Sequence, residues 1–170
     1  GARFAHELLR KGGYREIDRT FKRPPASTEE ILHIDKYLRG KKDFVSLNPE
    51  DFRPKELSAD ARAVYQDTLG EFVISTLLGL GQKDRSAATR AAAGWGGDRV
   101  AVFETREKVE LSKLVWQSSW DTEVDAREFH DSYLNSLRGR FTWAEKMLSI
   151  EGPVVTFTCS LDEKSQSCKL

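Results

Sequence analysis

Acidic and histidine side chains capable of proton transfer gather on one predicted helix, at Glu29, Glu30 and His33. Carboxylate and imidazole groups this close together can support general acid–base chemistry. Ser27 also stands three residues before Glu30, the spacing of a capping box in which the two side chains satisfy backbone amides at a helix start. Capping on a solvated helix face is the favoured interpretation of these residues, and acid–base chemistry is the alternative.

Metal-ligand spacing is not found among the histidines. His6, His33 and His130 are far apart in the sequence, and the segment that begins His6-Glu7 has Arg10 where a zinc-binding helix would place its second histidine. The sequence also shows no motif in which a serine or cysteine nucleophile has a neighbouring base. We therefore expect no metal site, no cofactor and no catalytic residue in this chain.

The segment Gly94-Trp-Gly-Gly-Asp-Arg99 is too rich in glycine for ordinary helix or strand. We interpret it as a corner between a helix over 87–93 and a strand over 99–105, with Gly94 in the left-handed conformation that ends a helix. Trp95 is expected to fold back over a core. Asp98 and Arg99 are expected to hold the corner by accepting from amides and donating to carbonyls. Phosphate-binding loops run from strand to helix, the opposite order.

The strand predicted around 114–120 places Trp116, Ser118 and Trp120 on one face. An aromatic strand face can bind peptides or sugars, but packing of Trp116 and Trp120 under a helix is the favoured interpretation. Near the C-terminus, Cys159 and Cys168 either close a terminal disulfide or remain two free thiols, and we leave both alternatives open.

Composition excludes several function classes. Lys plus Arg and Asp plus Glu number 27 each in 170 residues, so there is no basic excess for binding nucleic acid. The longest apolar stretches fall short of the ~20 residues of a membrane-spanning helix. The start of the chain lacks the features of a signal peptide and an initiator Met, and we expect a mature product or a piece of something longer.

Hydrophobic spacing and turn residues predict an α+β fold in which N-terminal helices precede an antiparallel sheet, in the order helix, hairpin, helix, hairpin. The sheet is expected to pack against helices that start near Thr68 and Thr122. The first of these should bury a broad apolar stripe, formed by Leu69, Phe72, Val73, Thr76, Leu77 and Leu80. A composition change near residue 55 suggests an N-terminal helical segment over 1–55 and an α+β domain over 56–170.

The expected elements, in chain order, are helices over 2–11, 14–21 and 28–38, a short strand at most over 44–47, a helix over 59–65 capped by Ser58, a helix over 68–78, a Ser86-capped helix over 87–93, strands over 100–105 and 110–120, a helix to 137, and strands over 146–150 and 154–161.

Two motifs resemble a known family. They are Gly12-Gly13-Tyr14 through Arg23-Pro-Pro-Ala-Ser-Thr-Glu-Glu-Ile-Leu-His33, and Ala92-Ala-Gly-Trp-Gly-Gly-Asp-Arg99 followed by Val115-Trp116 and Trp120-Asp121. They are similar to the C-terminal half of prokaryotic secreted or surface lipoproteins related to zinc metallopeptidases. Longer members of that family carry an upstream HExxH helix and a glutamate expected to hold zinc, and this chain contains neither. Ile34 also replaces the proline usual after the histidine.

The resemblance implies an extracytoplasmic, non-catalytic portion of a metallopeptidase-like protein that supports an upstream domain or contacts substrate, with Glu30 and His33 beside the missing metal helix. The alternative is a free-standing extracytoplasmic binding module without enzymatic activity, which would bind a peptide or protein through exposed aromatics around Trp95 and Trp116. On either hypothesis we expect this chain alone not to be an enzyme.

Overall fold

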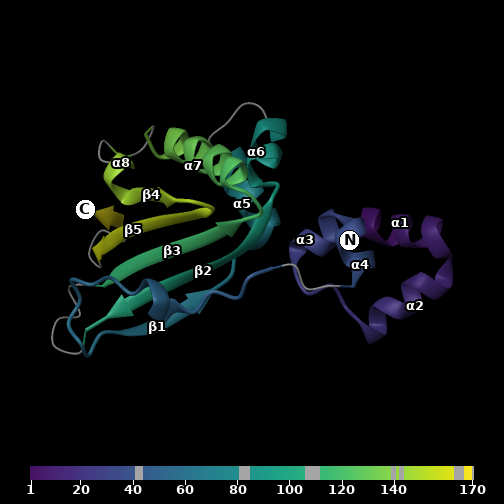
Figure 1. Cartoon of the computed structure of the whole chain (residues 1–170), viewed down its shortest axis with the longest axis horizontal. Coiled ribbons are helices and arrows are strands. Elements are labelled where there is room, and N and C mark those ends of the chain that lie inside the picture. The colour runs from purple at the N-terminus through teal and green to yellow at the C-terminus, as the bar shows by residue number, and fades with distance from the viewer. Residues whose placement is uncertain are drawn as a thin grey trace.

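A computed structural model of the chain describes residues 1–40, 44–80, 85–105, 112–138, 141, 144–162 and 167–169. Figure 1 shows two groups of elements: helices α1 to α4 lie together at one end, and an antiparallel sheet with helices α5 to α7 forms the larger part. This is the predicted α+β fold, with N-terminal helices before the strands.

The N-terminal helices follow the glycine and capping signals closely. Helix α1 (Ala2–Gly12) ends at the paired glycines, and α2 (Tyr14–Lys22) ends before the two prolines. Helices α3 (Thr28–Leu32) and α4 (Ile34–Arg39) replace the single helix expected over 28–38, because His33 has a non-helical backbone. Leu8 and Tyr37 are buried among these helices, and Phe4 packs edge-on against Tyr37 with ring centroids 5.1 Å apart.

The sheet contains β1 (Arg62–Asp67), β2 (Trp95–Glu104), β3 (Lys113–Trp120), β4 (Leu148–Glu151), β5 (Val154–Asp162) and β6 (Ser167–Lys169). Within the described residues the strand order is β1-β2-β3-β5-β4, with β6 paired to β5, and every pairing is antiparallel. The two predicted hairpins are therefore the β2–β3 and β4–β5 pairs, and they join through β3 and β5. The turn expected between the first two strands lies outside the described residues.

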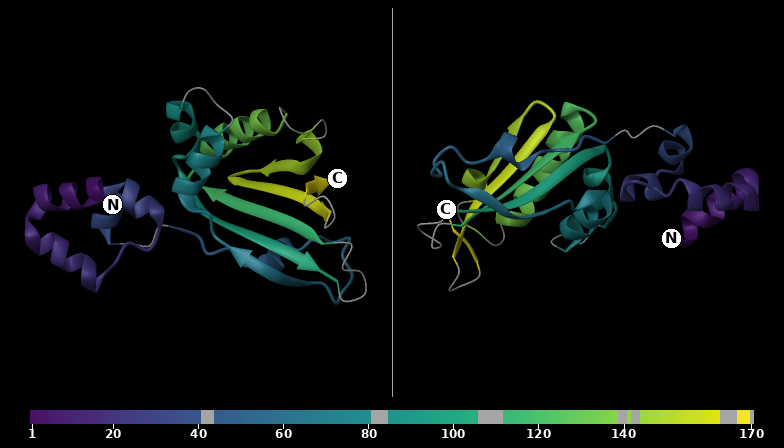
Figure 2. Two further views of the ribbon diagram at one scale, coloured as in Figure 1. Left: turned by 180° about the vertical axis from the view of Figure 1, so that it is seen from behind. Right: turned by 90° about the horizontal axis from the view of Figure 1, so that it is seen from below.

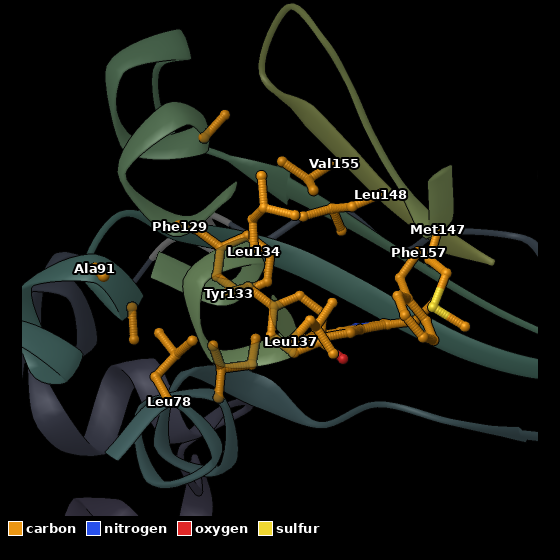
Figure 3. Close-up of a cluster of buried hydrophobic side chains, with 14 of the residues drawn as sticks. Leu78, Ala91, Phe129, Tyr133, Leu134, Leu137, Met147, Leu148, Val155 and Phe157 are labelled. Atoms are coloured by element: carbon orange, nitrogen blue, oxygen red, sulfur yellow. The ribbon is translucent and has the colours of Figure 1, made fainter. Parts of the chain in front are cut away.

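Helices cover one face of the sheet. Helix α5 (Gly70–Gly79), α6 (Arg85–Ala92) and α7 (Glu123–Arg138) lie on that side, and the short α8 (Ala144–Met147) leads into β4 (Figures 1 and 2). The main hydrophobic cluster fills the space between them and the sheet. Figure 3 shows Phe129, Tyr133 and Leu137 of α7 directed toward side chains such as Val155 and Phe157 of β5.

The opposite face of the sheet is covered by the connector that precedes it. Ala101, Phe103 and Val115 are buried there against Phe52 and Leu57. Phe52 belongs to the 3-10 helix η1 (Pro49–Phe52), and its ring lies edge-on to Phe103 at 6.5 Å. Residues 44–47 are extended without forming the short strand that the sequence allowed. These residues pack with the strands although the sequence placed them in the N-terminal segment.

Two predictions were wrong in this region. Residues 62–65, expected to belong to the helix over 59–65 capped by Ser58, lie in the edge strand β1, because pairing with β2 overrides the helix propensity of an alanine-rich segment. The apolar stripe expected in the core is largely exposed: Phe72 is 56% exposed, Val73 43% and Leu80 72%. Ile74, Leu78 and Glu71 are buried instead.

Smaller differences concern the ends of elements. Strand β2 begins at Trp95, within the glycine-rich corner, and β4 begins at Leu148 because Ala144–Met147 is helical. Helix α6 begins at Arg85 and so includes Ser86, which was expected to cap it. Thr122 caps α7 through its hydroxyl, which accepts from the Asp125 amide at 3.2 Å. Gly81 and Gly139, the glycines that follow the helices expected to end at 78 and 137, lie outside the described residues.

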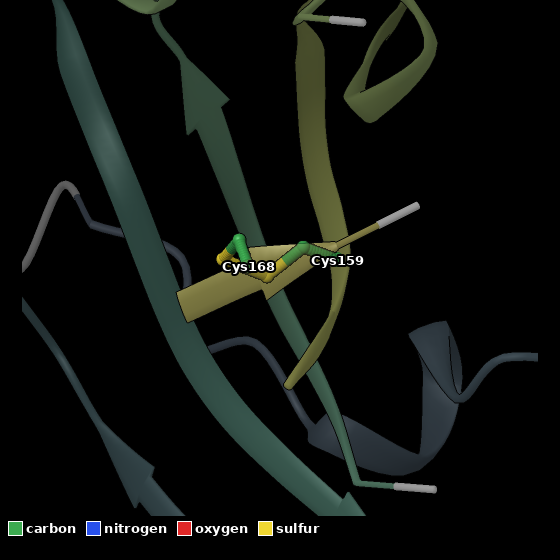
Figure 4. Close-up of a disulfide and its surroundings, with 2 residues drawn as sticks. All are labelled: Cys159 and Cys168. Carbon is green, nitrogen blue, oxygen red and sulfur yellow. A yellow bond between two sulfur atoms is a disulfide. The ribbon is translucent and has the colours of Figure 1, made fainter. Parts of the chain in front are cut away.

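The structure resolves the open question of the cysteines. Cys159 of β5 and Cys168 of β6 form a disulfide, with Cα atoms 5.4 Å apart (Figure 4). Cys168 therefore lies in a paired strand. The bridge and the β5–β6 pairing together fix the C-terminal segment onto the sheet.

Candidate functional site

Asp98 is the central polar residue of the glycine-rich corner, and the residue is only 3% exposed. One oxygen, Oδ1, accepts from the Gly70 amide and from Trp95 Nε1, both at 2.9 Å. The other, Oδ2, accepts from the Leu69 amide at 2.9 Å and from Trp116 Nε1 at 3.0 Å. The carboxylate thus caps the N-terminus of α5, where the helix dipole favours negative charge, and ties it to β2 and β3.

Gly94 and Arg99 complete the corner as the sequence predicted. Gly94 has φ +81°, the left-handed conformation that follows α6. Arg99 Nε donates to the Leu47 carbonyl at 3.3 Å, and the Val45 amide donates to the Gly96 carbonyl at 2.6 Å. The corner therefore anchors the extended connector before β1 as well as the start of α5.

The tryptophans of the corner and of β3 are core residues. Trp95 is 1% exposed, Trp116 4% and Trp120 3%. Trp120 stacks on Phe129 of α7 at 4.5 Å, and its Nε1 donates to Ser118 Oγ at 3.0 Å. The expectation that aromatics around Trp95 and Trp116 are exposed for binding is wrong, because Phe44 stacks on Trp95 and α7 covers Trp116.

A second polar site lies where α3 and α4 meet α5. We call it the interhelix polar cluster, and it consists of Glu29, His33, Lys36, Glu71 and Asp121. His33 Nε2 and Glu71 Oε1 are 2.8 Å apart, and the side chain of His33 is 40% exposed while that of Glu71 is 2% exposed. Lys36 Nζ contacts the carboxylate of Glu29 and reaches Asp121 Oδ2 at 2.8 Å.

Burial sets the protonation chemistry of the interhelix polar cluster. Desolvation raises the pKa of Glu71 above its ordinary 4.5, although the bond from His33 opposes the change. Desolvation likewise raises the pKa of Glu29, against the opposing effect of Lys36. The pKa of Lys36 is raised because its bonds to Asp121 and Glu29 outweigh the effect of burial. Glu71 Oε2 is buried without a hydrogen-bond partner in the described structure, which adds to the desolvation of this carboxyl group.

Glu30 and His33, which the sequence singled out together, point to different partners. Ser27 Oγ accepts from the Glu30 amide at 3.4 Å, and Glu30 Oε2 accepts from the Ala26 amide at 2.7 Å. Arg23 lies 3.6 Å from the other oxygen of Glu30. Glu30 therefore serves the helix start, whereas His33 contacts Glu71. Glu30 and His33 therefore do not form an acid–base pair.

Sequence reasoning missed Glu71, Lys36 and Asp121. Glu71 carried a usable signal, since a single acid inside an otherwise apolar helix needs a partner when buried. Asp121 and Lys36 are 85 positions apart, and their pairing depends wholly on the fold. Within the described ranges the structure contains no group of three or more His, Cys, Asp or Glu side chains placed to hold a metal ion.

Two cavities flank these sites. One, of about 300 Å³, lies beside the corner and is lined by side chains that include Thr28, Phe44, Trp95 and Arg99. The other, of about 360 Å³, lies between α5, α7 and the sheet. Its lining is mostly apolar and includes Leu77, Leu114, Trp116, Leu137 and Phe157. No helix within the described residues is long and apolar enough to cross a bilayer.

Residues 57–163 match the family model of DUF8575, a domain of unknown function. The chain belongs to the DUF8575 family. Neither the curated proteins nor the solved structures yielded a match. The DUF8575 region includes the Asp98 corner and Glu71, whereas Glu30 and His33 precede it. The His33–Glu71 pair thus links the DUF8575 region to the helices before it.

Proposed function

We propose that this chain is a non-catalytic portion of a secreted metallopeptidase-like protein, in which it supports an upstream domain or contacts substrate. The class of protein comes from the resemblance of the two motifs. The structural support comes from the Asp98 carboxylate, whose two oxygens accept from two backbone amides and two indoles within the chain. A group so fully engaged stabilises the fold and leaves no lone pair directed at a substrate.

The interhelix polar cluster supports the same proposal. Lys36 bridges Glu29 of α3 to Asp121 before α7, and His33 joins α3 and α4 to Glu71 of α5. These contacts hold the N-terminal helices against the DUF8575 region. In a larger protein, that arrangement would fix the position of the helices that carry the first motif relative to the sheet.

Zinc analysis of the purified chain tests the proposal. After dialysis we expect no stoichiometric zinc, because Glu29, His33 and Glu71 lack the geometry of a metal site. One tightly retained zinc per chain that disappears in His33→Ala would overturn the proposal and make the interhelix polar cluster a metal centre. His130→Ala is the matched control, since His130 contacts Asp131 on the surface of α7.

The full reading frame provides an independent test. An HExxH segment encoded upstream supports the proposal, and in that longer protein Asp98→Asn should lower the folded fraction while peptidase activity per folded molecule is kept. Loss of activity at an unchanged melting temperature would show that the corner is part of an active site.

The apolar cavity between α5, α7 and the sheet favours a second candidate, a free-standing extracytoplasmic binding module. Its volume of about 360 Å³ is within the range of small-ligand sites. A start codon directly before residue 1 and saturable binding of a hydrophobic dye would support this candidate. Leu77→Trp, which should fill the cavity, is expected to abolish that binding, and Val64→Trp on the exposed strand β1 is the control.

A further inference from the structure

Helix α2 presents aromatic side chains to solvent. Tyr14 is 76% exposed and Phe21 84%, and α2 contains no buried residue in the structure. Exposed apolar residues that gather on one face, rimmed by polar residues, mark surfaces that bind a protein or a membrane. Helix α2 also lies at the end of the molecule farthest from the C-terminus, where the sheet does not cover it (Figure 1).

In the sequence of α2, a basic residue directly follows each of these two aromatic residues. Tyr14 and Phe21 are seven residues apart, which brings them to the same face of a helix two turns apart. Arg15 and Lys22 follow them directly and form a parallel row beside the aromatic one. Within the described structure, neither Arg15 nor Lys22 makes an ion pair, whereas Arg19 is paired with Glu16.

Basic residues are also more frequent at the N-terminal end of the chain, and acidic residues are more frequent in the rest of it. Residues 1–23 hold seven Lys or Arg and three Asp or Glu, a net charge of +4 from 7 − 3. Since the whole chain has 27 of each kind, residues 24–170 have 20 and 24, a net charge of −4. The basic end is therefore attracted to an anionic surface while the rest of the molecule is repelled from it.

We propose that the aromatic and basic face of α2 binds the surface of an anionic lipid bilayer. Tyr14 and Phe21 enter the headgroup region, where aromatic side chains are favoured. Arg15 and Lys22 contact the lipid phosphates. A second copy of this chain fits the face less well, because two basic surfaces repel each other. The interaction is peripheral: one short helix rests on the surface and crosses nothing.

Asp18 is the residue of this face that opposes binding. It lies one turn from Tyr14, Arg15 and Lys22 and is exposed. Its negative charge reduces the attraction to anionic lipid, so Asp18→Asn is expected to strengthen binding about 5-fold, given roughly 1 kcal/mol per charge near the surface.

The test is flotation of the purified chain with vesicles of phosphatidylglycerol and phosphatidylcholine, compared with phosphatidylcholine alone. We expect binding to the anionic vesicles only, lost near 1 M salt where the Debye length is about 3 Å. Arg15→Gln with Lys22→Gln should weaken binding about 30-fold, and Tyr14→Ser with Phe21→Ser at least ~10-fold. Circular dichroism should show that both variants stay folded, because the four side chains are exposed.

Matched controls come from the DUF8575 region. Arg62→Gln with Arg90→Gln removes two exposed cations, and Phe72→Ser removes an exposed aromatic, so both should leave vesicle binding unchanged. Equal binding to both vesicle types, or equal losses in the control variants, overturns the proposal. So does self-association that depends on Tyr14 and Phe21 in a chain that ignores anionic vesicles.

Discussion

Removal of the Asp98 carboxylate should be the most damaging single change in the corner. Asp98→Ala leaves four buried donors without an acceptor, namely the amides of Leu69 and Gly70 and the indoles of Trp95 and Trp116. Each unsatisfied buried donor costs about 1 to 3 kcal/mol, so four give a ceiling of roughly 4 to 12 kcal/mol. Since a domain of this size is stable by about 5 to 15 kcal/mol, Asp98→Ala should be largely unfolded.

Asp98→Asn is the more informative variant because it preserves the shape of the side chain. Its amide keeps one accepting oxygen, but its NH₂ group must face two of the four donors, and the negative charge at the start of α5 is lost. We expect a loss of about 2 to 4 kcal/mol in the free energy of unfolding. Urea denaturation followed by far-ultraviolet circular dichroism measures it, and hydrogen exchange of the two indole N–H groups reports the site directly.

The matched control is Asp131→Asn on the surface of α7, where the carboxylate is 75% exposed and a change below about 0.5 kcal/mol is expected. If Asp98→Asn unfolds at the same urea concentration as the wild type, the carboxylate does not hold the corner. An equal loss in Asp131→Asn would show that the measurement reflects charge in general and not the buried bonds.

Three further predictions concern other parts of the fold. Gly94→Val should lower the free energy of unfolding by at least ~1 kcal/mol, because φ is +81° and an added Cβ would lie 2.5 Å from Asp125 Cγ. Gly152 has φ +55° and open space around it, so Gly152→Val measures the cost of the backbone strain alone in the same urea assay. Burial raises the pKa of Glu71, so protonation of Glu71 stabilises the folded chain fully below pH 4.5, and this stabilisation is lost as the pH rises through the raised pKa. Glu71→Gln should reduce the resulting fall in the free energy of unfolding, and an unchanged pH profile of that free energy would contradict the assignment. Reduction of the Cys159–Cys168 bridge should lower the free energy of unfolding by about 2 to 3 kcal/mol. Cys168→Ala should show the same loss and no further effect of reductant, which would attribute the loss to the bridge.

Local signals predicted much of this fold. The Ser27 capping box, the paired glycines after α1 and Gly94 after α6 each work through their immediate neighbours, so the sequence locates them well. The β2–β3 hairpin and the burial of Trp116 and Trp120 follow from alternation along one strand. These features depend on few long-range contacts.

The failures share a dependence on contacts between distant segments. Residues 62–67 have the burial pattern of an edge strand with one half-buried position, so no alternation marked them as β1. Helix α5 is apolar nearly all round, and only its docking against the sheet determines that Ile74 and Leu78 are buried rather than Phe72. The His33–Glu71 pair spans 38 positions and forms only when α3 meets α5.

The nature of the contacts between the N-terminal helices and the sheet has a consequence for local stability. The two hydrophobic clusters around the sheet take their members from Phe44 onward. Helices α3 and α4 instead contact α5 and the segment before α7 through polar pairs such as His33–Glu71 and Lys36–Asp121. Ionic contacts such as these contribute less net stability than a buried apolar core, because their Coulomb attraction is offset by the desolvation of the charged groups. Helices α1 to α4 can therefore open as a cooperative unit while the sheet remains closed, and their amides should exchange with solvent long before those of β3 and α7. Trp116 and Trp120 pack against Phe129 of α7, so their fluorescence should not change during that opening.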